Sequence, residues 1–305
     1  NFKALSESFV VRKNQRIFGE RVETTLYFGT DSLYHPSLDM RLDLLKNEII
    51  LDKGSRGSDQ SPFYDSYHKT QIISTKVTWL IDRDTLVFGQ FKPLINVNSQ
   101  VALVESNNFY TDTDFRRFQN VSSVNPVASM KIYADKTQKR LFDADELVRR
   151  IDPKLDATSA QSMLYDMASQ GFLKFDPDNK TIELKDKIFL FNAAQQKKID
   201  YDILRFVSDT KSENAVFHLS DKNLYLFGVK IVDLSSKQKV RASPTEQALV
   251  LKKNRDFDFD GRINAGMTVF TGKKFKFEYA PFTVQADSVR YFDLYLATSN
   301  EQFAH

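Results

Sequence analysis

Short runs of alternating apolar and polar residues dominate the first 140 residues of the chain. The runs ERVETTLYFG and TKVTWLIDRDTLVFGQF are rich in β-branched and aromatic residues, and Gly and Asp interrupt them. Alternation with a period of two is typical of strands that bury one face. Residues 1–140 are therefore predicted to form a β-rich region.

A helical pattern occupies residues 141–199. Asp143 stands three positions before Glu146, as in a capping box, and Thr158 begins a second segment of the same kind. Gly171 fits the position just after the end of that second helix. The segments GFLKF, DPDN and KTIELKDK then predict a strand, a turn and a strand. The order helix, helix, hairpin predicts a winged-helix-like module.

Residues 200–305 return to strand patterns. In GKKFKFEY, Lys274 and Lys276 fall on one face, and Phe275 and Phe277 fall on the other. The predicted fold is therefore mainly β. Its body is expected to be an elongated solenoid-like or sandwich arrangement, with a small winged-helix-like α+β module inserted.

Composition excludes several classes of site. The chain of 305 residues has no cysteine, so it holds no disulfide framework, thiol nucleophile or cysteine-based metal site. Its 43 basic and 40 acidic residues nearly balance, which gives no indication of a nucleic-acid or membrane partner. No apolar run approaches the ~18 residues of a membrane-spanning helix. The start at Asn1 lacks a signal-peptide pattern, so we expect a processed chain or a piece of a longer one.

The stretch RDFDFDGRIN resembles the start of an EF-hand calcium loop. Asp256, Asp258, Asp260 and Gly261 occupy the first, third, fifth and sixth loop positions, but the twelfth is Met267, where the loop needs Glu. The alternation of Asp and Phe also fits a half-buried strand that ends near the glycine. We favour the strand, and a cation site on the three aspartates remains the alternative.

A winged-helix outline raises the question of DNA binding. The second predicted helix exposes mainly Ser, Gln and Asp, and residues 141–190 contain ten acidic and seven basic residues. A net negative unit opposes binding to phosphates. A structural role for this module is therefore expected, with no nucleic-acid partner.

Two histidines lie among aromatic residues and near aspartates. His35 occurs in LYHPSLD with Asp39, and His68 occurs in PFYDSYHK with Asp65. A metal-dependent hydrolase site drawn from these residues is one hypothesis. Neither stretch has the spacing of a known catalytic motif, and no G-x-S-x-G elbow occurs. A hydrogen bond that only fixes a loop is the simpler interpretation, and no cofactor is expected.

Several long stretches resemble very large, poorly characterised cell-envelope proteins of Bacteroidota. The stretches span nearly the whole chain, in the order YFGTDSLYHPSLDMRLD, PFYDSYHK, LVESNNFYTDTDFRRFQNVSSVNPVASM, KIDYDILRFVSDT and KNRDFDFDGRINAGMTVFTGKKFKFEY. The resemblance implies export to the periplasm or outer membrane and a β-rich body with a small helical module. It brings no activity and no catalytic residue.

These observations lead to one main functional prediction and two alternatives. The main prediction is a non-enzymatic scaffold segment of a large exported cell-envelope protein, with other envelope proteins as partners. The first alternative is a glycan-binding or ligand-binding, adhesin-like module that uses exposed tyrosines such as Tyr64 and Tyr67. The second is the metal-dependent hydrolase around His35 and His68.

Overall fold

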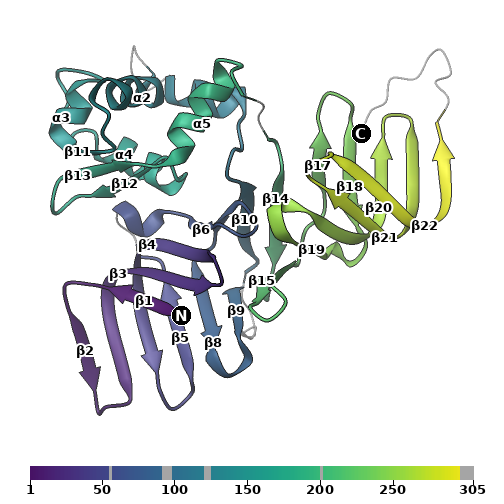
Figure 1. The fold of residues 1–305 in the computed structure, drawn as a ribbon, viewed down its shortest axis with the longest axis horizontal. Helices are drawn as coiled ribbons and strands as arrows, with labels where there is room; N and C mark the ends of the chain where they lie inside the picture. The colour runs from purple at the N-terminus through teal and green to yellow at the C-terminus, as the bar shows by residue number, and fades with distance from the viewer. Residues whose placement is uncertain (55–56, 91–97, 120–124, 200–201, 296–305) are drawn as a thin grey trace.

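The structure is a computed structural model that describes residues 1–54, 57–90, 98–119, 125–199 and 202–295 (Figure 1). Within these ranges the chain is mainly β, as its alternating pattern predicts, and helices interrupt the strands near the middle. The strands form one sheet of 19 strands and another of three. None of the helices in these ranges combines the length and the apolar character needed to cross a bilayer.

A long hairpin of β3 and β4 organises the first part of the large sheet. Strands β1 and β2 pair with the outer edge of β3. The other edge of β4 pairs with β5 along residues 39–43 and with β6 along residues 33–34, so the sheet divides into two branches there. The bounds are β1 (Phe2–Leu5), β2 (Phe9–Arg12), β3 (Arg16–Phe28), β4 (Asp31–Asp43), β5 (Glu48–Asp52), β6 (Phe63–Asp65), β7 (Thr70–Ile73), β8 (Lys76–Leu80), β9 (Thr85–Gly89) and β10 (Gln100–Ser106).

The two branches meet again at β14 (Arg205–Thr210) and β15 (Glu213–His218). One branch runs through β5, β8 and β9 to β15, and the other runs through β6, β7 and β10 to β14. Because β14 and β15 follow each other directly along the chain, the branches enclose a nearly closed antiparallel sheet. The solenoid-like or sandwich body expected from the sequence is not what forms. Pairs such as Phe217 with Leu86 join segments that are distant in the sequence. The local alternation of apolar and polar residues does not predict such pairs.

The remaining strands extend the sheet beyond β15. Strand β16 pairs with β15 and β19, β20 pairs with β18, β19 and β21, and β22 pairs with β21. The predicted regions 1–140 and 200–305 therefore contribute strands to one sheet. The bounds are β16 (Asn223–Leu226), β17 (Val232–Ser235), β18 (Val240–Pro244), β19 (Leu249–Leu251), β20 (Phe257–Ala265), β21 (Thr268–Glu278) and β22 (Thr283–Leu294).

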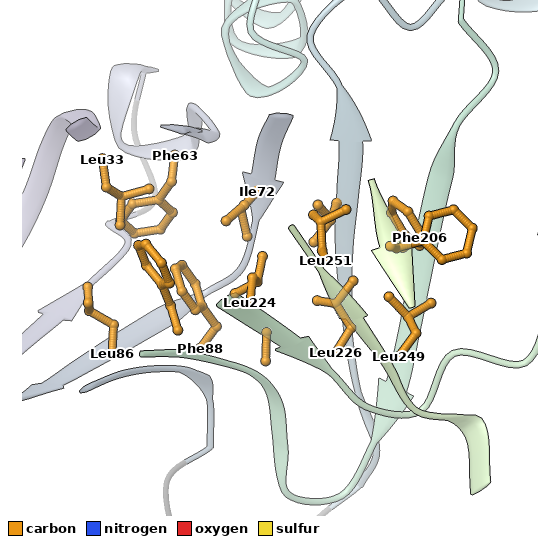
Figure 2. Packing of buried hydrophobic residues seen from close by; sticks show 14 of the residues in the cluster. Leu33, Phe63, Ile72, Leu86, Phe88, Phe206, Leu224, Leu226, Leu249 and Leu251 are labelled. Carbon is orange, nitrogen blue, oxygen red and sulfur yellow. The ribbon is translucent and has the colours of Figure 1, made fainter. Parts of the chain in front are cut away.

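One apolar core serves both halves of the large sheet. The rings of Phe63 and Phe88 pack edge to face with centroids 5.8 Å apart, and Phe206 packs against Phe257 at 5.4 Å. Each fully buried Phe or Leu contributes about 1.5–3 kcal/mol to the free energy of unfolding. Figure 2 shows the continuity of this cluster from the N-terminal to the C-terminal strands, through Leu33, Phe63, Leu86, Phe88, Ile72, Leu224, Leu226, Leu251, Leu249 and Phe206.

The helical unit has its own core and its own three-stranded sheet, ordered β11, β13, β12. Asp143 caps α3 by accepting a hydrogen bond from the Glu146 backbone N–H at 2.9 Å, as predicted. Gly171 follows α4 with a φ of +79°, also as predicted. The bounds are α1 (Asp112–Gln119), α2 (Pro126–Thr137), β11 (Leu141–Asp143), α3 (Ala144–Arg149), α4 (Gln161–Ser169), β12 (Leu173–Asp176), β13 (Thr181–Leu184) and α5 (Asp186–Gln195).

Three details of this unit differ from the prediction. Thr158 is not a helix cap, because α4 begins at Gln161 and Asp156 instead binds the Ser159 backbone N–H in the preceding turn. Helix α5 was not expected, since its buried face includes Lys187 and Asn192, which hide the apolar pattern. The core cluster also includes residues from α2, so the helical unit extends to the N-terminal side of residue 141.

The helical unit is attached to the large sheet by polar contacts. Ser58, in the short 3₁₀ helix η1 (Gly57–Gln60), donates its hydroxyl to the Phe175 carbonyl at 2.6 Å. Lys174 forms an ion pair of 2.8 Å with Glu23 of β3. Figure 1 shows the unit lying next to the end of the sheet that carries β4 and β6. The module that the sequence separates from the strands is therefore packed directly on them.

Candidate functional site

His68 and Asp65 form a buried contact, as their spacing suggested. His68 Nδ1 lies 2.5 Å from Asp65 Oδ2, and its Nε2 donates to the Lys222 carbonyl at 3.1 Å. The same carboxylate accepts hydrogen bonds from the backbone N–H groups of Tyr67 and His68. Both ring nitrogens therefore face protein acceptors, and neither His68 nor Asp65 exposes its side chain. The pair fixes the β6–β7 turn against the β15–β16 turn.

His35 is also buried and fully hydrogen-bonded. Its Nε2 donates to the Ser61 carbonyl at 2.8 Å, and its Nδ1 accepts from the Ser37 backbone N–H at 3.1 Å. Burial, followed by the nearby Lys53 charge, lowers the pKa of His35 well below its usual range. The ring is therefore a neutral structural group in β4.

The structure does not join these histidines into one site. His35 packs against Phe63 and His68 packs against Phe217, while Asp39 lies exposed farther along β4. Within the described ranges, no group of three or more His, Asp or Glu side chains could hold a metal ion. The hydrolase hypothesis therefore has no assembled centre among these residues.

The aspartates of the EF-hand-like stretch lie along or beside a strand. β20 begins at Phe257, buries Phe257 and Phe259, and continues into a hairpin with β21, so no helix–loop–helix forms. Asp256 accepts from the Tyr279 backbone N–H, and Asp260 accepts from the Lys274 backbone N–H, both at 2.8 Å. Asp258 is ion-paired with Lys252. Protein donors therefore contact all three carboxylates, and the strand prediction is confirmed.

Gly261 has a packing role in this strand. A Cβ atom at this position would lie 2.3 Å from the Ser243 carbonyl oxygen of β18, and the φ of Gly261 is +154°. The register of β20 with β21 also shifts between Phe259 and Gly261. Close approach of backbones at an irregularity explains a glycine in a strand. The match to the sixth EF-hand position is thus accounted for by sheet packing.

The two tyrosines expected to be exposed are half-buried. Tyr64 lies in β6 with its ring 5.9 Å from that of Tyr34, and its hydroxyl is buried without a hydrogen-bond partner among the described residues. Tyr67 packs on the core, and the ammonium groups of Lys222 and Lys253 lie over its ring. Neither ring is free to stack on a glycan, because each tyrosine packs against its own sheet.

A cleft that no sequence pattern indicated lies between the helical unit and the large sheet. It has a volume of about 430 Å³ and takes its lining from both parts of the chain. Glu105 at the end of β10 binds two cations there: Arg205 at 2.6 Å and Lys187 of α5 at 3.6 Å. The Arg205 guanidinium lies 4.1 Å from the centre of the Phe109 ring. These residues come from separate elements, so no short sequence motif predicts that they lie together.

Lys187 is the most buried cation of the cleft. Its ammonium donates to the Gln170 carbonyl at 2.8 Å and to Gln71 Oε1 at 3.1 Å, besides pairing with Glu105. Burial lowers the pKa of Lys187, and the Glu105 carboxylate opposes that effect. The ammonium thus makes two hydrogen bonds and one ion pair. Lys187 therefore ties α5 to the sheet.

Lys53 lines the same cleft but has fewer partners. Its ammonium donates to the Gln60 carbonyl at 3.3 Å and lies 6.0 Å from the centre of the Phe63 ring. No Asp or Glu in the described part of the chain pairs with it, and burial alone lowers the pKa of Lys53 to about 8. Leaving a half-buried ammonium without a carboxylate is costly in free energy.

No family model, curated protein or solved structure matches the chain.

Proposed function

We propose that this chain is a non-enzymatic interaction scaffold within an exported cell-envelope protein, and that it binds partner proteins at the two ends of its large sheet. One observation carries the proposal: both terminal edges of the sheet are exposed strands with apolar side chains. An open strand edge presents unpaired N–H and C=O groups on which another chain can add a strand.

The C-terminal edge is β22. Among the described residues this strand pairs only with β21, and nearly all of its residues are exposed. Its exposed side chains include Tyr291, Leu294 and Phe292, the last with 62% of its surface accessible. Natural edge strands usually carry charges, prolines or a covering element that prevents pairing. Although β22 also carries Asp287, Arg290 and Asp293, its exposed aromatic residues Tyr291 and Phe292 favour binding of an extended partner segment.

The N-terminal edge is β2. Within the part of the chain that the structure describes, this strand pairs only with β3, and all four of its residues are exposed. Val10 and Val11 are both more than half accessible, Val11 at 57%. Figure 1 shows β2 and β22 far apart, at opposite ends of the molecule. One continuous sheet and one core connect them, so two partners bound there would be held at a fixed separation.

The helical unit fits the scaffold proposal as a brace. Its order of helix, strand, helix, helix and hairpin, from α2 to β13, corresponds to that of a winged helix, and we include this likeness in the proposal. In a DNA-binding winged helix the second helix of the helical pair enters the major groove. Here that helix is α4, which packs beside η1 of the large sheet. This contact supports a structural role for the module.

The location at the cell envelope rests on the resemblance of the five stretches described above. Fractionation of cells that produce the protein natively tests it. The protein should appear in the periplasmic or outer-membrane fraction, and recovery from the cytoplasm would contradict the proposed location.

Affinity capture tests the scaffold proposal. The tagged protein is crosslinked in its native cells and compared with Val10→Lys/Val11→Lys and Tyr291→Lys/Phe292→Lys variants. We expect a stoichiometric set of envelope proteins with the wild type, and each pair of substitutions should remove a different subset. Ile132→Lys, which charges an exposed apolar residue of α2 away from both edges, is the matched control. Recovery of the protein alone would refute the proposal.

A further inference from the structure

We propose that the cleft between the helical unit and the large sheet binds a small anionic molecule through a carboxylate or phosphate group, with Lys53 as a contacting residue. The proposal is independent of the scaffold role, because it uses neither edge strand. Three features of the cleft support it: its size, its excess of cationic groups and its aromatic walls.

The cleft has the size of a small-molecule site. Ligand pockets commonly enclose about 300–1,000 Å³ and combine apolar walls with a few polar groups. At about 430 Å³, this cleft lies within that range. Phe109, Phe172 and Phe191 line it, and they can pack against the apolar part of a ligand.

The charges lining the cleft are not fully compensated. The single carboxylate of Glu105 is divided between Arg205 on Oε1 and Lys187 on Oε2. The Arg205 Nε is buried and has no hydrogen-bond partner among the described residues. Among the described lining residues, Arg117 pairs with Asp166 and Arg205 also lies 3.9 Å from Asp114, so Lys53 is the cation of the lining with no acidic partner in the described ranges.

Lys53 is the residue whose surroundings point most directly to an anionic ligand. Its ammonium has three N–H groups, and the Gln60 carbonyl is its one hydrogen-bond acceptor within the described ranges. A ligand oxyanion would supply both the remaining acceptors and the missing negative charge. Carboxylates and phosphates share this chemistry, since each presents several acceptor oxygens to a buried cation.

Calorimetric titration with benzoate, phenyl phosphate and neutral benzamide tests this proposal on the whole chain. We expect saturable binding of at least one anion with a Kd of about 1 mM, the range of a few polar contacts, and no binding of benzamide. Stronger binding of benzoate identifies the carboxylate class, and stronger binding of phenyl phosphate identifies the phosphate class.

Two variants assign the binding to the cleft. Lys53→Met keeps the length of the side chain and removes the charge, so the Kd should rise about tenfold or more, as expected for loss of one buried ionic contact. Lys230→Met, which removes an exposed lysine outside the cleft, should leave the Kd unchanged. Circular dichroism and urea denaturation establish that both variants fold. If neither anion binds saturably, or if Lys53→Met binds as the wild type does, the proposal is wrong.

Discussion

Glu105 and Lys187 face each other across the boundary between the large sheet and the helical unit, with Oε2 and Nζ 3.6 Å apart and each side chain only 5% exposed. Glu105 belongs to β10, and Lys187 belongs to the first turn of α5. Arg205 shares the same carboxylate from β14. A single acidic group thus contacts three elements and adds to the polar contacts that hold the helical unit on the sheet.

Removing this carboxylate should destabilise the protein strongly. Glu105→Met leaves the buried Lys187 ammonium without its charge partner, so the free energy of unfolding should fall by about 3–5 kcal/mol. Adding Lys187→Met removes the uncompensated charge and should recover part of the loss. Urea denaturation measures all three proteins. The exposed pair of Asp233 and Arg241 is the control, where Arg241→Met should cost no more than about 1 kcal/mol. Equal losses at the buried and exposed pairs would contradict this account.

Lys53 should make stability depend on pH in the alkaline range. Its pKa is about 8 in the folded chain, against an ordinary value of 10.5 for an exposed lysine. The unfolded state therefore binds more protons between these values, and the free energy of unfolding rises with pH from 8 toward 10.5. Below pH 8 the charged Lys53 lowers the free energy of unfolding by its full amount, on the order of 3 kcal/mol. Its titratable neighbour His35, with its lowered pKa, stays neutral across this range.

Urea denaturation of the wild type and Lys53→Met at pH 7 and pH 9.5 checks this dependence. The variant should be more stable than the wild type at pH 7, and the difference should shrink at pH 9.5. A difference that is the same at both pH values would show that Lys53 does not titrate in this window.

Gly261 should not tolerate a side chain. Gly261→Ala places a methyl group 2.3 Å from the Ser243 carbonyl oxygen and forces a strained φ, so unfolding free energy should fall by about 2–4 kcal/mol. Gly266→Ala is the matched control, because Gly266 also has a positive φ, +61°, but a Cβ atom there would meet nothing within 4 Å. Its cost should be only about 1 kcal/mol, the strain of the backbone alone. Thermal unfolding compares the two, and equal losses would argue against the close approach of β18 and β20.

The sequence predicted the elements whose determinants are local. The alternation in GKKFKFEY is confirmed, since Phe275 and Phe277 of β21 are fully buried while Lys274 is exposed. The Asp143 cap and Gly171 are likewise confirmed, because a cap depends on neighbouring backbone atoms only. The union of both β regions in one sheet depends on distant pairs such as Phe217 with Leu86, which have no sequence pattern of their own.

The candidate site was harder to predict than the strands. His35 and His68 were candidates for a metal-dependent site because histidine can bind metals and transfer protons. In the structure each is buried and hydrogen-bonded to its own sheet. Lys187 and Lys53 looked like ordinary surface lysines, because burial of a charge is decided by tertiary packing. Strand β22 mixes Val, Tyr, Phe and Leu with Asp287, Arg290 and Asp293, and its place at the end of the sheet leaves nearly all of these residues exposed.

Photocrosslinking from single positions tests the central claim, partner binding at the sheet edges, most directly. Benzoylphenylalanine is placed at position 292 in β22, at position 10 in β2 or at position 132 in α2, and native cells are irradiated. We predict adducts with envelope proteins from positions 292 and 10, different for the two edges, and none from position 132. No adducts from either edge, or the same adducts from all three positions, would contradict the scaffold account.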